Sequence, residues 1–147
     1  MYKHILVAVD GSDTSNLALQ EAIKLAKEQQ AQLRIVHVVE DIPLNIDTEY
    51  ALDEYQEAMR KTGEAVLSKA EALARESGVT LETKLLQIET LGHRITNLVV
   101  EEAQSWPADL IVLGTHGRRG FNHLLMGSVA EGIVRVSPQP VLLIRGK

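Results

Sequence analysis

The segment that sets the fold of this chain reads Ile5-Leu6-Val7-Ala8-Val9-Asp10-Gly11-Ser12, a short apolar run that ends in a turn signal. The β-branched residues predict a buried strand, and Asp-Gly-Ser predicts a turn directly after it. Apolar positions at helical spacing follow from about Ser15 to Gln29, and we expect Asp13, Thr14 or Ser15 to cap that helix. A second strand is expected over residues 33–39, so the chain opens with a β-α-β unit.

The same alternation continues to the end of the chain. An irregular connection over residues 40–50 is followed by an amphipathic helix whose apolar stripe covers residues 52–73 and which ends near Gly78. The remaining expected elements are a half-exposed edge strand over 79–88, a helix from Ile95 that Pro107 ends, an apolar strand over 110–113, a helix from Ser128 and a strand over 141–144. This order predicts one α/β domain over residues 1–147, with a doubly wound parallel sheet and helices on both faces.

Composition removes several classes of function. The 147 residues are 45% hydrophobic and only 3% aromatic, and the formal net charge is −5, so a nucleic-acid partner is not expected. The absence of cysteine excludes disulfides and thiolate metal sites. No apolar run approaches the roughly 20 residues that span a bilayer, and the start of the chain resembles no signal peptide. We therefore expect a cytoplasmic protein that does not insert into membranes.

The most informative motif follows the strand over residues 110–113. It reads Gly114-Thr115-His116-Gly117-Arg118-Arg119-Gly120-Phe121-Asn122-His123-Leu124-Leu125-Met126-Gly127-Ser128, which has the spacing Gly-x2-Gly-x9-Gly-Ser. Glycines allow close approach of a ligand or positive φ, and free N–H groups at the following helix suit an anion. Strands one and four are the most uniformly apolar, so their ends should lie side by side where ligands bind in such sheets.

Local charge supports a small anionic ligand. Between residues 114 and 135, Arg118, Arg119 and Arg135 oppose only Glu131, which gives +3 − 1 = +2 in an acidic protein. The two adjacent arginines are more often a solvated pair than phosphate ligands. His116 and His123 are candidates to line the site, although neither has the spacing of a metal ligand.

Each of these residues also has a purely structural interpretation. Asp10 can simply hold the turn after the strand, and Ser128 can simply cap the last helix. The glycines alone fit a flexible loop equally well, and their exact spacing before a helix favours binding. His37 is interpreted as a hydrogen-bonded core residue rather than a metal ligand.

Taken together, these segments resemble the universal stress protein family over the whole chain. The matching pieces are residues 5–12, Val36-His37-Val38-Val39, the run from Ala108 to Gly117, the glycine spacing and Pro140-Val141-Leu142-Leu143-Ile144. The resemblance implies strand order 3-2-1-4-5 in a Rossmann-like sheet, similar to the adenine nucleotide alpha hydrolases, and a protein that is usually dimeric. Two departures are Ala8, where ATP-binding relatives can have proline, and Leu91-Gly92-His93-Arg94, which lacks a frequent Gly-x-Pro.

The complete glycine motif places the chain with the ATP-binding members of that family. Carried over by motif position, Asp10 and the backbone of Ala8 and Val38 would hold the adenosine end, and Leu113 and Gly114 would flank adenine and ribose. The phosphates, with Mg²⁺ or Mn²⁺, would be held by Gly117, Gly127, Ser128 and Val129. No catalytic or metal-ligating side chain is assigned.

Three functions follow from these observations. The first is an ATP-binding regulatory protein of the stress response, which signals to an unidentified protein partner. The second is an enzyme, at most a slow ATPase or a nucleotidyl transferase, although no P-loop or His-x-Gly-His signature is present. The third is a nucleotide-free stress protein that acts through protein contacts. In each case, the apolar strand Val141–Ile144 at the sheet edge predicts a homodimer.

Overall fold

The computed structural model describes residues 1–39, 49–88, 94–116 and 126–146. Their strands and helices alternate as β1 His4–Ala8, α1 Asp13–Gln29, β2 Gln32–Val39, α2 Glu49–Glu76, β3 Leu81–Gln87, α3 Ile95–Ser105, β4 Leu110–Gly114, α4 Ser128–Val136 and β5 Val141–Ile144. The predicted order of strands and helices is confirmed.

The five strands form one parallel sheet in the order β3-β2-β1-β4-β5. β1 lies at its centre, where Ile5 pairs with Leu33 of β2 on one side and with Leu110 of β4 on the other. The expected strand order is therefore confirmed. β3 and β5 are the edge strands, which accounts for the alternating polar pattern of β3.

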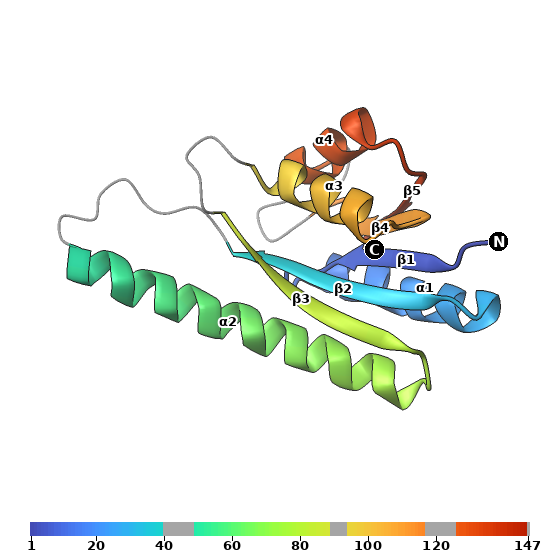
Figure 1. The fold of residues 1–147 in the computed structure, drawn as a ribbon, viewed down its shortest axis with the longest axis horizontal. Coiled ribbons are helices and arrows are strands. Elements are labelled where there is room, and N and C mark those ends of the chain that lie inside the picture. Colours follow the sequence, from blue (N-terminus) through green and yellow to red (C-terminus); the bar gives the residue numbers. More distant parts are fainter. Residues whose placement is uncertain (40–48, 89–93, 117–125, 147) are drawn as a thin grey trace.

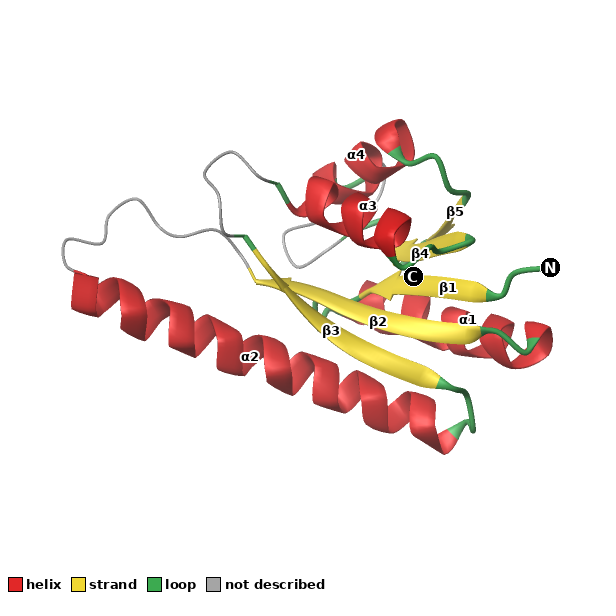
Figure 2. Cartoon of the chain, viewed as in Figure 1, coloured by secondary structure: helices red, strands yellow, loops and turns green. Residues whose placement is uncertain are grey.

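Helices cover both faces of the sheet. Figures 1 and 2 show α1 and α2 against one face and α3 and α4 against the other. The side chains of β1 alternate between the two apolar cores, because successive residues of a strand point to opposite faces. Ile5 and Val7 belong to the core beneath α1 and α2, whereas Leu6 belongs to the core beneath α3 and α4.

α1 begins at Asp13, earlier in the chain than the expected start near Ser15. The Ser12 side chain accepts a hydrogen bond from the Ser15 N–H at 3.2 Å, and the helix starts at Asp13. A capping residue keeps an extended backbone, and Ser12 has that conformation, with φ −74° and ψ 162°. The expectation that Asp13, Thr14 or Ser15 is the cap was therefore wrong.

α2 is the longest helix of the described residues, with 28 residues. The strand that follows it, β3, has seven. Figure 1 shows its amino-terminal end extending beyond the carboxyl end of β3. The chain then turns at Gly78, whose φ of 77° favours glycine. Within the described part of the chain, no helix is both long enough and apolar enough to cross a membrane.

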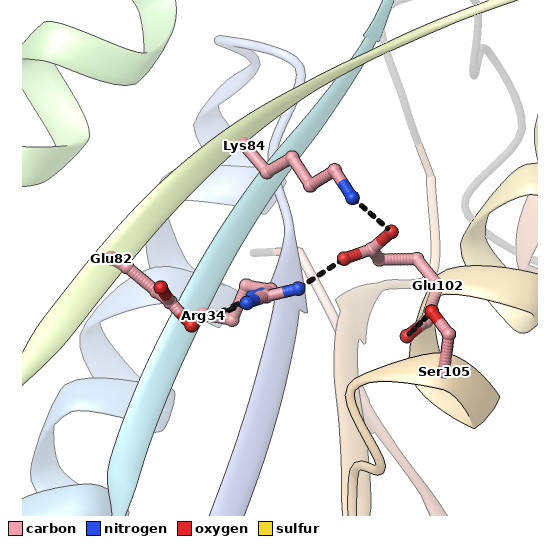
Figure 3. Close-up of polar contacts among 5 residues, drawn as sticks. All are labelled: Arg34, Glu82, Lys84, Glu102 and Ser105. Atoms are coloured by element: carbon pink, nitrogen blue, oxygen red, sulfur yellow. Dashed lines mark hydrogen bonds and ion pairs between the residues drawn. The ribbon is translucent and has the colours of Figure 1, made fainter.

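A cluster of ion pairs fixes α3 to the β2–β3 side of the sheet (Figure 3). Glu102 of α3 is 6% exposed, and its carboxylate binds Arg34 of β2 and the Lys84 Nζ, the latter at 3.0 Å. Arg34 also binds Glu82 and lies 4.9 Å from the ring centre of Trp106. The hydrogen bond from Arg34 lowers the pKa of Glu82 below its ordinary value.

A second polar contact joins the chain start to β4. The Asp109 carboxylate accepts hydrogen bonds from the Lys3 and His4 backbone N–H groups, each at 2.9 Å. The pKa of Asp109 is lowered, and the largest cause is the hydrogen bond from the Lys3 N–H. Burial of the carboxylate acts in the opposite direction, and the hydrogen bond from the His4 N–H lowers the pKa further. The Asp109 contact lies at the amino ends of β1 and β4, opposite the carboxyl ends where the predicted site lies.

Candidate functional site

The predicted site residues gather at the carboxyl ends of β1, β2 and β4. The chain leaves β1 toward β2 through α1 on one face, and it leaves β4 toward β5 through α4 on the other face. The strand order therefore reverses between β1 and β4, where ligands bind in open sheets. Four predicted residues share the core beneath α3 and α4: Ala8, Val38, Leu113 and Val129.

Asp10 organises the turn that leaves β1. Its Oδ1 accepts a hydrogen bond from the Ser12 N–H at 2.9 Å, and its own N–H donates to the Ser15 Oγ at 3.1 Å. The structural interpretation of Asp10 as a turn residue is therefore confirmed. These bonds also hold the half-buried Asp10 in a fixed place beside the ends of β2 and β4.

The peptide groups of Val38 point toward the β1 side, beyond the last residue of β1 that pairs with β2. The Gln32 N–H donates to the Lys3 carbonyl, and the Val36 carbonyl accepts from the Val9 N–H, so even-numbered residues of β2 point toward β1. The N–H and C=O of Val38 point the same way, because this direction repeats every second residue. The pairing of β1 with β2 ends at Ala8 and Val36.

This geometry ends the β1–β2 ladder before it reaches the Val38 peptide groups. Among the residues that the structure describes, no backbone hydrogen bond reaches the Val38 N–H or C=O from the β1 side. Val38 is only 7% exposed, and buried peptide groups in folded proteins are nearly always hydrogen-bonded. A donor and an acceptor on one residue therefore point together toward the β1 side, past the last pair of the ladder at Ala8 and Val36.

Next to this position, His37 makes the contact expected of a core residue. Its ring is 8% exposed, and its Nδ1 lies 2.8 Å from the Val9 carbonyl oxygen. A carbonyl only accepts, so Nδ1 carries the proton and donates. The interpretation of His37 as a hydrogen-bonded core residue is confirmed. Its acceptor is the carbonyl of Val9, the residue before Asp10, and no sequence pattern indicated this contact.

Gly114 lies in direct contact with the start of α1. A Cβ at Gly114 would lie 2.7 Å from the Cγ2 of Thr14 and 3.2 Å from the Thr14 carbonyl oxygen. The glycine thus lets the first turn of α1 pack directly on the end of β4. Of the described glycines, only Gly11 and Gly78 have positive φ, so positive φ is not the reason for glycine at residue 114.

The first turn of α4 carries backbone N–H groups for which no acceptor is found among the residues that the structure describes. The cap is Gly127, with φ −65° and ψ 159°, and no side chain accepts a hydrogen bond there. The interpretation of Ser128 as the cap was wrong, because it is already the first helical residue. The first described backbone bond inside α4 runs from the Glu131 N–H to the Gly127 carbonyl at 3.0 Å. The N–H groups of Ser128, Val129 and Ala130 therefore precede the helical ladder, as an anion site requires.

Thr115 connects this helix start to the edge strand. Its carbonyl accepts from the Gly127 N–H at 2.7 Å, and its own N–H donates to the Ile144 carbonyl at 2.9 Å. Thr115 is 7% exposed, and its hydroxyl lies 3.0 Å from the His116 Nδ1. Two hydrogen bonds through one residue thus join the start of α4 to the end of β5.

Several predicted residues lie outside the described residues or away from the site. Gly117, Arg118, Arg119 and His123 fall in the stretch 117–125, which the structure does not describe. Arg135 is in the last turn of α4 and pairs with Glu131 at 3.0 Å, so it adds no free charge near the helix start. Across the described ranges, no three histidine or acidic side chains are grouped as metal ligands.

The β5 edge carries exposed apolar side chains. Leu142 of β5 is 36% exposed, and Val134 and Val136 of α4 are 45% and 55% exposed. Leu143, by contrast, packs against the core beneath α3 and α4. Apolar groups beside an unpaired strand edge favour association with another chain.

Comparisons with known proteins point to one family. The model of the universal stress protein family matches residues 1–145. The universal stress protein YxiE of Bacillus subtilis is 37% identical over 153 aligned positions, which cover 99% of this chain and 100% of YxiE. The structure of the universal stress protein UspA from Lactobacillus plantarum is similar with a TM-score of 0.84 and 28% identity, and 98% of each chain is covered.

Two similar structures contain adenine nucleotides. A universal stress protein in complex with cAMP has a TM-score of 0.73 and 26% identity, over 99% of each chain. The universal stress protein from Archaeoglobus fulgidus in complex with dAMP has a TM-score of 0.66 and 26% identity, over 98% of each chain.

Proposed function

Because this chain belongs to the universal stress protein family, we propose that it binds ATP and acts as a nucleotide-dependent regulatory homodimer in the stress response. The observation that carries this proposal is the Val38 peptide, whose N–H and C=O lack partners on the β1 side among the described residues. The nucleotides in the two similar structures, cAMP and dAMP, support the adenine class of ligand.

The Val38 peptide complements adenine in particular. Adenine presents a hydrogen-bond acceptor, N1, next to a donor, the N6 amino group. The Val38 N–H donates to N1 and its C=O accepts from N6, while Leu113 and Ala8 supply apolar walls from the same core. Asp10, fixed by its turn, and Gly114 lie beside the ribose. Because the Val38 peptide is buried, a base that fails to pair with its N–H and C=O leaves them without hydrogen bonds, which is costly. Adenine is therefore preferred over bases with a different hydrogen-bonding edge.

The phosphates extend toward α4. The N–H groups of Ser128 and Val129, the Ser128 hydroxyl and the positive end of the helix dipole stabilise their negative charge, with Gly127 giving close access. Gly117 belongs to the same predicted cradle. Mg²⁺ or Mn²⁺ would be held mainly by phosphate oxygens, since Mg²⁺ commonly binds through substrate phosphates with few protein ligands.

A nucleotide in this position connects the site to the proposed dimer edge. The ligand would bridge Val38 at the end of β2 and the start of α4, and Thr115 joins that start to Ile144 of β5. Pairing of β5 with a second copy would cover the apolar groups around Leu142. Binding shifts the dimer between states only as far as its affinities for those states differ, and one state is recognised by a regulatory protein partner.

Native mass spectrometry of the purified protein tests this proposal. We expect an adenine nucleotide to co-purify, and its mass identifies ATP, ADP, AMP or a cyclic nucleotide. The control is Gly127→Ala, in which the added methyl narrows the approach of the phosphates. Its backbone angles suit alanine, so this variant should fold and lose the bound nucleotide. Equal occupancy in both proteins would contradict the phosphate site, and turnover of several ATP per second would favour an enzyme.

A further inference from the structure

His37 connects three elements around the proposed adenine site. The residue lies on β2, and its Nδ1 donates to the Val9 carbonyl at the exit of β1. From the other side, α2 presses on the ring at Gly63, where a Cβ would lie 2.9 Å from the His37 Cδ2. The ring is thus confined by helix packing, and its donor is aimed at one backbone oxygen.

That backbone oxygen is the natural partner of the Val38 N–H. In a parallel ladder, a residue that donates to residue j of the next strand accepts from residue j+2. Val9 donates to Val36, so continuation of the ladder would bring the Val38 N–H to the Val9 carbonyl. The pairing stops at Ala8 and Val36, and the Val9 carbonyl instead accepts from His37.

We propose that His37 is a positioning residue that keeps the Val38 N–H available for ligand by holding the Val9 carbonyl. The importance of this N–H for adenine rests on the function proposed above. The effect on the backbone does not depend on it, because it concerns only which donor binds the Val9 oxygen. His37 touches no part of the nucleotide in this arrangement.

Loss of the ring donor has a defined structural consequence. Val9 is buried, at 5% exposure, and loss of the His37 donor would remove the hydrogen bond to its carbonyl, which is unfavourable. The nearest donor that can replace the His37 ring is the Val38 N–H. Its hydrogen bond to the Val9 carbonyl would add one bond to the β1–β2 ladder and extend β1 by one residue. Ligand would then have to break that bond before binding, so affinity falls even though no ligand contact has been deleted.

Two variants of similar shape separate the donor from the packing. Asparagine places an amide nitrogen near the position of the imidazole Nδ1, whereas leucine places a methyl group there. Both variants lose the same ring contact with Gly63, so any loss caused by packing is common to them. His37→Asn should retain the bond to Val9, and His37→Leu should lose it.

Hydrogen exchange of the Val38 amide, measured by NMR without ligand, is the first test. We expect the amide to exchange about tenfold more slowly in His37→Leu than in His37→Asn, because only the former forms the extra ladder bond. The Val36 amide, on the same strand, is the internal reference and should change little. Equal Val38 exchange in the two variants would overturn the proposal.

Titration with an adenine nucleotide is the second test. We expect His37→Leu to bind about fivefold more weakly than His37→Asn, which is the effect of one competing hydrogen bond. Equal affinities in these variants would overturn the proposal. If the wild-type protein binds no adenine nucleotide, the proposed function fails, and the exchange of the Val38 amide still decides the role of His37.

Discussion

A Cβ atom added at Gly114 would lie 2.7 Å from the Cγ2 of Thr14, so the end of β4 and the first turn of α1 are in direct contact. Thr14 also faces Gly146, where an added Cβ would lie 2.8 Å from its Oγ1. One threonine therefore fits between Gly114, the last residue of β4, and Gly146, which lies beyond the end of the neighbouring strand β5. This packing brings the start of α1 close to the site and makes Gly114 a structural requirement.

Gly114→Ala should therefore destabilise the fold by about 1–3 kcal/mol, as overpacking does elsewhere. Thr14→Ser removes the Cγ2 methyl and should restore part of that loss in the double variant. Urea unfolding followed by the fluorescence of Trp106, the single tryptophan, measures both effects. Additive losses in the double variant would show that the Thr14 methyl is not the source of the strain.

Ser12, the cap of α1, and Ser128, the first residue of α4, should respond differently to removal of their hydroxyls. Ser12→Ala should cost about 1 kcal/mol of unfolding free energy, because Ser12 caps α1. Ser128→Ala should change stability by less than about 0.5 kcal/mol, because Ser128 is exposed and is not the cap.

Nucleotide affinity completes this comparison. Ser128→Ala should weaken ATP binding by about tenfold, since it removes a hydrogen bond to a charged phosphate. Equilibrium titration of the folded variant measures the change. Unchanged affinity would remove the Ser128 hydroxyl from the proposed phosphate cradle.

The proposed dimer is best tested at Leu142. A charge at Leu143 would also disturb the core beneath α3 and α4, whereas Leu142 is partly exposed at the sheet edge. Leu142→Lys should yield folded monomers, measured by light scattering during size-exclusion chromatography. Gln87→Lys, at the exposed opposite edge, is the matched control and should remain dimeric. A dimer that survives Leu142→Lys would exclude this interface.

Acid stability should depend on Asp109. Backbone donation from Lys3 and then His4 holds its pKa below the ordinary value, so its contribution is present above the unfolded pKa of about 3.9. That contribution is lost as the pH falls through the lower folded-state pKa. Asp109→Asn should therefore be less stable at neutral pH and should lose less stability on acidification.

Urea midpoints at a series of pH values measure this difference. The control is Asp53→Asn, which makes the same change of charge on an exposed position of α2. Parallel stability curves for the wild type and Asp109→Asn below about pH 4 would contradict the proposed role of Asp109.

Local sequence signals were sufficient to predict the order of strands and helices along the chain. The apolar runs at residues 5–9 and 110–113 predicted the central strands, and the alternation at residues 79–88 predicted an edge strand. These patterns predict strands correctly because a strand buried on both faces is apolar throughout, and a strand buried on one face alternates apolar and polar residues. The resemblance to the family supplied the strand order, which no local pattern contains.

Details of the candidate site depend on contacts between distant segments. Gly114 was assigned to ligand approach, and its neighbour is Thr14, one hundred residues earlier in the chain. Ser128 was assigned as a cap, and the backbone places Gly127 there. The bond from His37 to Val9 joins two strands and cannot be read from either segment. Such pairings follow from the packed fold rather than from spacing.

Isothermal titration calorimetry of ligand-stripped protein with Mg²⁺ and either ATP or ITP tests the central claim most directly. ITP carries a donor at N1 and an acceptor at position 6, the reverse of adenine, and therefore mismatches the Val38 N–H and C=O. We predict saturable binding of one ATP per chain and affinity for ITP lower by about tenfold or more. Equal affinities would contradict recognition of the base by Val38, and absence of heat with every adenine nucleotide would contradict the proposed function itself.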